Sequence, residues 1–172
     1  MPRSGQTLVH PTTGQRLTFV RTGQDSAGAE LVLHSVLPAG SPRPPPHVHP
    51  HQEERFIPLE GSLRGWVGRR RVVVRPGEVL VVPPGVPHTL GGEGRLRWEF
   101  RPALRTGELL EAVVGVAVRR GALVRGLPRP LPLAAVLRGF QAEIRLALVP
   151  PVLQRALLAA LGRVGEQRRG RP

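Results

Sequence analysis

Three histidines lie within five residues of one another, and two glutamates follow them closely. His47 and His49 are separated by one residue, and a β-strand places residues i and i+2 on the same face of a sheet. Glu54, five residues after His49, reaches the same point if the chain bends or bulges between them. Imidazole nitrogens and a carboxylate oxygen are suitable ligands for a divalent transition metal. The spacing therefore indicates a metal site, although it does not name a reaction.

A second stretch downstream ends in another histidine. The first stretch has two histidines one residue apart, a glutamate after four residues and a glycine after six more. The second has a glycine, a proline, a glycine and a histidine with spacers of five, one and two residues. The positions are His47, His49, Glu54 and Gly61 in the first stretch and Gly77, Pro83, Gly85 and His88 in the second. These stretches closely resemble the paired motifs of the cupin superfamily, and the resemblance covers roughly residues 6–100.

The resemblance implies a mainly β fold, the double-stranded β-helix, which is a small jelly-roll-like barrel with its site inside. It also implies that His47, His49, Glu54 and His88 hold one divalent transition metal, which could be Fe, Mn, Ni, Co, Cu or Zn. Four protein ligands leave one or two open positions for water or substrate on a five- or six-coordinate ion. Glu54 could also act as a catalytic base. Because the imidazoles must be neutral to bind, we expect metal loss as the pH falls through about 6–7.

Two neighbouring residues are alternative ligands. His51 has the same strand parity as His49, but it follows a proline and could point out of the barrel. Glu53 competes with Glu54 for the carboxylate role, and the spacing to Gly61 favours Glu54. The other histidines have no partners in the sequence and are interpreted as structural: His10 and His34.

The first hundred residues are punctuated by glycine, proline and serine, and the runs between them are short and apolar or alternating, which favours strands. We expect strands at 17–20, 31–37, 55–59, 63–67, 71–75, 79–82 and 95–101. Many short strands without intervening helices are typical of a sandwich or a small closed barrel. The aromatic residues are interpreted as core or cavity wall: Phe56, Trp66, Trp98 and Phe100.

After Pro102 the hydrophobic period changes to three- and four-residue steps. Three amphipathic helices are predicted from the stripes over 109–117, 133–148 and 153–164. We therefore expect a barrel over residues 1–102 and a helical extension over residues 103–172. The apolar stripes need partners, which could be the outer face of the barrel, its mouth or a second copy of the chain. Packing on the barrel together with a homodimer is the preferred interpretation.

The composition excludes several kinds of chemistry. The chain has no Cys, Lys or Tyr, so it cannot use a thiolate, a lysine Schiff base or a tyrosine acid. The net charge is +13, and all 25 basic residues are arginine, with the excess concentrated after residue 100. We interpret them as a solvated face and expect no nucleic-acid or membrane partner, since no nucleic-acid motif and no apolar span are visible. Without a signal peptide, a cytoplasmic location is expected.

The chemistry must therefore depend mainly on the metal, and four functions stay open. The first is a metal-binding cupin that holds a small oxygen-containing molecule, with no specific activity assigned. The second is a metal-dependent dioxygenase of the quercetinase-like kind. The third is a sugar or sugar-phosphate isomerase, which predicts a polar pocket with an inward arginine. The fourth is a protein that binds a small molecule without turnover.

Overall fold

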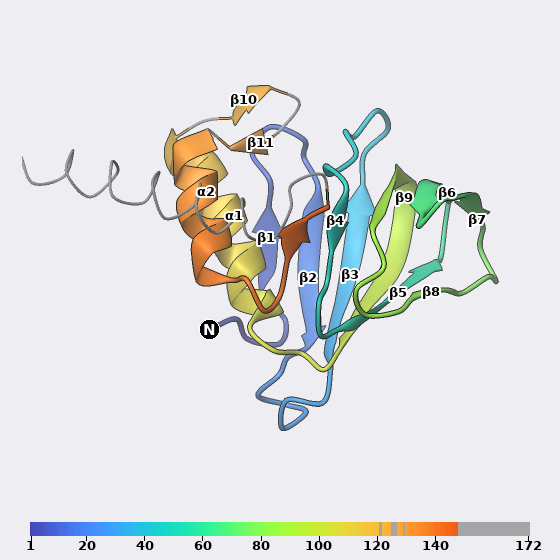
Figure 1. Cartoon of the computed structure of the whole chain (residues 1–172), viewed down its shortest axis with the longest axis horizontal. Coiled ribbons are helices and arrows are strands. Elements are labelled where there is room, and N and C mark those ends of the chain that lie inside the picture. The colour runs from blue at the N-terminus through green and yellow to red at the C-terminus, as the bar shows by residue number, and fades with distance from the viewer. Residues whose placement is uncertain (121, 125–126, 129, 148–172) are drawn as a thin grey trace, which may run out of the picture.

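The computed structural model describes residues 1–120, 122–124, 127–128 and 130–147. More of these residues lie in strands than in helices, and two helices follow the first nine strands (Figure 1). The strands are β1 (Thr7–Val9), β2 (Arg16–Arg21), β3 (Leu31–Leu37), β4 (His47–Val48), β5 (Glu53–Pro58), β6 (Ser62–Val67), β7 (Arg70–Val74), β8 (Leu80–Val82), β9 (His88–Arg101), β10 (Ala122–Val124), β11 (Leu127–Pro128) and β12 (Arg145–Leu146). The helices are α1 (Thr106–Arg120) and α2 (Pro130–Gly139).

The longest strand, β9, organises the sheet. Its second half pairs antiparallel with β3 on one edge and with β5 on the other, with Leu96 opposite both Ser35 and Pro58. Its first half pairs with β6, and its first residue, His88, also pairs with His47 of β4. The two halves of β9 therefore belong to two layers, and alternate side chains of each layer point into the space between them.

Two glycines allow the turn before β6 to approach β9. A Cβ at Gly61 would lie 2.1 Å from the carbonyl oxygen of Glu93, and one at Gly94 would lie 2.1 Å from the carbonyl oxygen of Glu60. Both glycines also have positive φ, at 73° and 108°. Any side chain here would push the strands apart, which gives a physical reason for the glycine that ends the first motif.

The fold is mainly β as predicted, and its strands pair antiparallel, but the prediction of a closed barrel is wrong. Ten strands form one sheet through the path β1-β2-β3-β9-β4-β12 and side branches. In the part of the chain that the structure describes, β1, β7, β8 and β12 each pair with one neighbour. The sheet therefore has free edges among the described strands. The strand β9 pairs with four others, β3, β4, β5 and β6, but the outermost strands do not pair with one another to close a barrel.

The prediction of about three helices is also corrected. The first stripe forms α1, and the second forms α2, which ends at Gly139 well before residue 148. Residues beyond it turn and form β12, where Arg145 pairs with Val48 and Leu146 with His47. Residues 145–146 therefore form backbone hydrogen bonds with β4, where the expected helix would have formed them within itself. The third stripe, over 153–164, lies outside the described residues. Neither described helix is long and apolar enough to span a membrane.

Alternation along the strands separates an apolar interior from a charged exterior. One buried cluster lies between the layers, and it consists of Phe56, Leu63, Val74, Val82, Leu90 and Leu96. A second cluster lies toward α1, and it consists of Phe19, Leu31, Leu33, Phe100 and Ala103. The inward rows of β3, β5 and β9 therefore carry the core, as their period-two pattern predicts.

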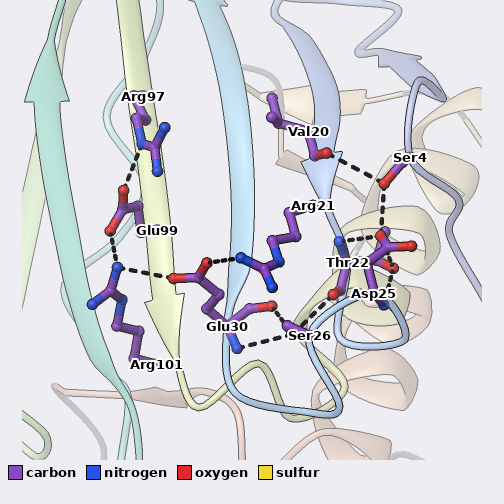
Figure 2. Close-up of polar contacts among 10 residues, drawn as sticks. All are labelled: Ser4, Val20, Arg21, Thr22, Asp25, Ser26, Glu30, Arg97, Glu99 and Arg101. Carbon is purple, nitrogen blue, oxygen red and sulfur yellow. Dashed lines mark hydrogen bonds and ion pairs between the residues drawn. The ribbon is translucent and has the colours of Figure 1, made fainter.

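The outward row of β9 carries a chain of ion pairs (Figure 2). Glu99 accepts hydrogen bonds from Arg97 Nε at 2.5 Å and from Arg101 Nη2 at 3.1 Å. Arg101 also pairs with Glu30, which accepts a bond from Arg21. The side chains of Arg97 and Arg101 are 41% exposed, so solvent screens these pairs, and each contributes about 1 kcal/mol or less to stability. Their main consequence is that the carboxylate of Glu99, which is almost fully buried, is surrounded by donors.

Candidate metal centre

Three imidazoles and one carboxylate come together at one point inside the fold. Their ligand atoms, one from each of His47, His49, Glu54 and His88, all lie within 4.8 Å of one another, and all four residues are buried. Nε2 of His88 lies 2.6 Å from Oε2 of Glu54, and Nε2 of His49 lies 3.4 Å from the same oxygen. The cluster that the family resemblance implies is therefore present, with a geometry that could hold a metal ion.

The strand pairing explains how distant residues meet. His47 begins β4 and His88 begins β9, and the two are direct partners in the ladder. Glu54 lies on β5 opposite Phe100, near the other end of β9. His49 follows β4, and its carbonyl accepts a hydrogen bond of 2.8 Å from the amide of Gly85. The loop between Pro83 and His88 is therefore fixed to the histidine segment, which accounts for the second motif.

Each imidazole is oriented by a backbone carbonyl. Nδ1 of His47 lies 2.9 Å from the Pro45 oxygen, and Nδ1 of His88 lies 3.0 Å from the Val86 oxygen. Nδ1 of His49 lies 2.6 Å from the carbonyl of Glu143, in the segment between α2 and β12. A carbonyl only accepts, so we assign the proton of each neutral ring to Nδ1. The three Nε2 atoms are then left with free lone pairs, which is the tautomer that binds metals.

The atoms that converge lack conventional hydrogen-bond partners. Among the described residues, Nε2 of His49, Nε2 of His88 and Oε2 of Glu54 are buried and make no hydrogen bond of acceptable geometry. The short contact between His88 and Glu54 is therefore a close approach without a well-directed N–H. Three nitrogens and one oxygen are the donors that Zn, Fe, Ni, Co, Mn and Cu sites use. Unsatisfied buried atoms cost free energy, and a cation among them removes that cost.

Trp98 completes the immediate surroundings of the carboxylate. Its indole N–H donates a hydrogen bond of 2.7 Å to Oε1 of Glu54. One carboxylate oxygen is therefore held by the indole, while Oε2 is directed at the imidazoles. The sequence indicated only that Trp98 was core or cavity wall. Its place in the alternating pattern of residues 95–101 puts Trp98 on the inward face of the strand. A buried indole N–H requires an acceptor, and this requirement could have identified its role.

Burial and mutual charge shift the pKa values of the cluster. For His47, burial is the main cause, and it lowers the pKa from 6.5 to about 4. The pKa of His49 is also lowered, again mainly by burial. Burial alone would lower the pKa of His88 and raise that of Glu54. The close contact between the two outweighs it, so the pKa of His88 is raised and that of Glu54 is lowered. Two imidazoles are therefore held neutral and ready to coordinate.

The four residues line a largely apolar cavity of about 280 Å³. Phe56, Leu63, Leu90 and Leu96 of the strands supply one part of its wall. The helical extension supplies another part, with Leu109, Leu110, Val113, Leu137 and Ile144. In Figure 1, α1 and α2 lie beside each other at one end of the sheet. A small molecule bound at the cluster would therefore touch both the strands and the extension.

The alternative ligands lie elsewhere. The carboxylate of Glu53 pairs with Arg55 Nε at 2.6 Å and is 31% exposed, so it is turned away from the cluster. His51 and His34 are exposed. His10, interpreted as structural, lines the cavity but does not belong to the metal-binding group. The carbonyl of Glu143 was not foreseen, because no sequence pattern marks a backbone acceptor in a distant turn.

Comparisons with known proteins agree with this architecture. Residues 33–100 match the family model described as the cupin domain. An RmlC-like cupin from Shewanella frigidimarina is 19% identical, and the alignment covers 62% of this chain and 94% of that one with a TM-score of 0.51. This likeness shows a shared fold.

Two other solved structures are more distant. A cupin-like protein from Thermotoga maritima is 18% identical over 61% of this chain and 82% of that one, with a TM-score of 0.47. The Streptomyces nucleoside dehydratase Pac13 is 12% identical over 62% and 88%, with a TM-score of 0.49. Among curated proteins, none matches this sequence. Residues 33–100 of this chain therefore match the cupin family, and the fold is shared with an RmlC-like cupin.

Proposed function

We propose that this chain binds one divalent transition metal through His47, His49, Glu54 and His88 and uses it to hold a small, largely apolar molecule by an oxygen atom. The observation that supports the proposal best is the position of the cluster, with its unsatisfied Nε2 and Oε2 atoms in the wall of an apolar cavity. Apolar walls provide affinity, while a few polar groups fix the orientation of a ligand.

The metal, when bound, would supply Lewis acidity and a coordination position for the ligand oxygen. The chain supplies the rest. The carbonyls of Pro45, Val86 and Glu143 hold the imidazoles in one tautomer, and Trp98 holds one oxygen of Glu54. The apolar side chains exclude water, which strengthens polar interactions at the site.

Glu54 is our candidate for a proton acceptor. It is the one carboxylate among the described residues that line the cavity. Its lowered pKa keeps it ionised, so it can accept a proton, but as a weak base. We therefore propose Glu54 as a ligand first and as a base second.

A metal-dependent dioxygenase acting on an aromatic diol or diketone is the second candidate. The lining is dominated by aliphatic and aromatic side chains, and Arg43 is the one arginine among the described residues that line the cavity. An apolar wall suits an aromatic ring better than a sugar, which would need many hydrogen-bond partners. The lining therefore favours the dioxygenase over the sugar isomerase. Binding without turnover is compatible with the same site.

Metal content measured by mass spectrometry is the first experiment. We expect about one metal ion per chain in gently purified protein, loss of this metal in His49→Ala, and no change in His34→Ala. The second variant is a matched control because His34 is exposed on β3. Equal metal in the wild type and His49→Ala would end the proposal. Oxygen consumption with catechol or acetylacetone would then separate a dioxygenase from a binding protein.

Three features remain predictions from the sequence. We propose that the division between barrel and extension lies near residue 102, that the chain forms a homodimer, and that it is located in the cytoplasm. Limited proteolysis tests the division, light scattering tests the dimer, and cell fractionation tests the location.

A further inference from the structure

The cavity has a second polar end, away from the metal ligands. Glu54 pairs with Phe100 of β9, whereas Ser35 pairs with Leu96, four residues earlier on the same strand. A strand rises by about 3.3 Å per residue, so the row of Ser35 lies roughly 13 Å from the row of Glu54. The space between the two rows is lined by apolar side chains such as Phe56.

Ser35 is a polar residue at a position that the strand pattern assigns to the core. It is 1% exposed, and its partner across the sheet is Leu17. Gln15 Nε2 donates a hydrogen bond of 3.1 Å to its hydroxyl oxygen. Within the described residues the Ser35 hydroxyl donates to no protein acceptor, so its proton is available to a ligand. Other polar residues line the cavity as well: His10, Thr13 and Ser41.

Arg43 also contributes to the lining of the cavity, and its side chain is exposed. It lies in the proline-rich segment 41–46, which restricts the backbone. A Cβ at Gly91 would lie 2.4 Å from Cγ of Arg43, so the missing side chain makes room for the stem of the arginine. Gly91 is three residues from His88, which places it about 10 Å from the metal ligands. In the described part of the chain, no carboxylate forms an ion pair with Arg43, so its exposed guanidinium can pair with a carboxylate of a ligand.

We propose that Ser35, Gln15 and Arg43 form a second subsite, which binds a carboxylate at the far end of the ligand. This inference rests on the proposed function, since it assumes that a metal holds the other end. The ligand is then an elongated apolar molecule with an oxygen donor at one end and a carboxylate roughly 10 Å away. The guanidinium compensates the carboxylate, and the Ser35 hydroxyl donates to it.

Two probes of matched length test the subsite. Octanohydroxamic acid carries a bidentate oxygen donor and an apolar chain, and the monohydroxamate of suberic acid adds a carboxylate at the far end. Titration calorimetry on nickel-loaded full-length protein measures both affinities. We expect the carboxylate probe to bind about tenfold more tightly, because a charge-assisted hydrogen bond has this magnitude. Arg43→Gln should remove most of this preference and leave the affinity for octanohydroxamic acid unchanged.

Arg70→Gln serves as the matched control, since Arg70 is an exposed arginine outside the cavity lining. It removes the same charge and should preserve the preference. Ser35→Ala should reduce the preference by a smaller factor.

Metal-dependent binding of both probes with equal affinity would overturn the second subsite and leave the proposed function intact. An equal loss of preference in Arg43→Gln and Arg70→Gln would also overturn it, because the effect would then come from net charge. Failure of both probes to bind nickel-loaded protein would overturn the proposed function itself.

Discussion

Two glutamates on neighbouring strands are almost fully buried, and their surroundings are opposite. Glu99 points outward from β9 between Arg97 and Arg101, which donate to both of its oxygens (Figure 2). Glu54 points inward from β5, toward imidazole nitrogens that lack directed hydrogen bonds. A buried charge that is surrounded by permanent donors is compensated within the fold. A buried charge whose partners are ligand atoms is a place for a cation.

The largest expected effect separates these two roles. Glu54→Gln should weaken metal binding by on the order of a hundredfold or more, because removing a direct ligand exceeds the 10- to 100-fold effect of losing a supporting residue. Glu99→Gln should bind metal as the wild type does. Competition with a chromophoric chelator measures both affinities. Equal weakening in the two variants would remove the distinction between the glutamates.

A pH dependence is expected from the inner cluster of the metal-free protein. The pKa of His47 is lowered to about 4 in the folded state, below its ordinary 6.5. The folded state therefore binds this proton less readily than the unfolded state, and stability falls as the pH drops from 6.5 to 4. The loss is roughly 3 kcal/mol. The lowered pKa of His49 acts in the same direction. The raised pKa of His88 opposes it, because its contribution to stability is present below pH 6.5 and is lost as the pH rises through the pKa of the folded state.

Urea unfolding at several pH values, with His47→Gln as the control, measures this effect. Glu54, whose pKa is lowered, adds to the loss only below about pH 4.5. A stability that stays constant between pH 6.5 and 5 in the wild type would contradict the assignment of His47 as a buried neutral imidazole. The raised pKa of His88 also makes its proton the main competitor for the metal near neutral pH, which refines the expectation of metal loss around pH 6–7.

A smaller effect is expected at Trp98. Trp98→Phe keeps an aromatic ring and removes the N–H that donates to Glu54. We expect metal affinity to fall about tenfold, as is usual when a group that orients a ligand is removed. Trp66→Phe is the control, since Trp66 is 42% exposed. An unchanged affinity in Trp98→Phe would mean that the indole only fills space.

The smallest effect is expected on the outer face. Glu99→Gln weakens its pairs with Arg97 and Arg101, whose side chains are 41% exposed. Solvent screens such pairs, so we expect a loss of about 1 kcal/mol in the free energy of unfolding. Thermal unfolding at low and high salt measures it, and the difference from the wild type should shrink as salt is added.

The strands and the pair of histidines were predictable from local patterns, and the family resemblance supplied the rest of the ligand set. Period-two alternation located β3, β6 and the end of β9, and the one-residue spacing of His47 and His49 identified their shared direction. The residues after Gly139 were not predictable in the same way. Their stripe fits a helix, but the free edge of β4 provides a tertiary partner that local propensity does not include. The open sheet was missed for a similar reason, since pairing among distant strands leaves no local signal.

The carbonyl of Glu143 has a consequence for the synthesis of the protein. It orients His49 from 94 residues further along the chain. A nascent polypeptide that ends before this turn holds every side-chain ligand and still lacks the acceptor that sets one imidazole tautomer. The proposed ion should therefore bind tightly only after Glu143 has been synthesised, so that occupancy would report synthesis past this turn.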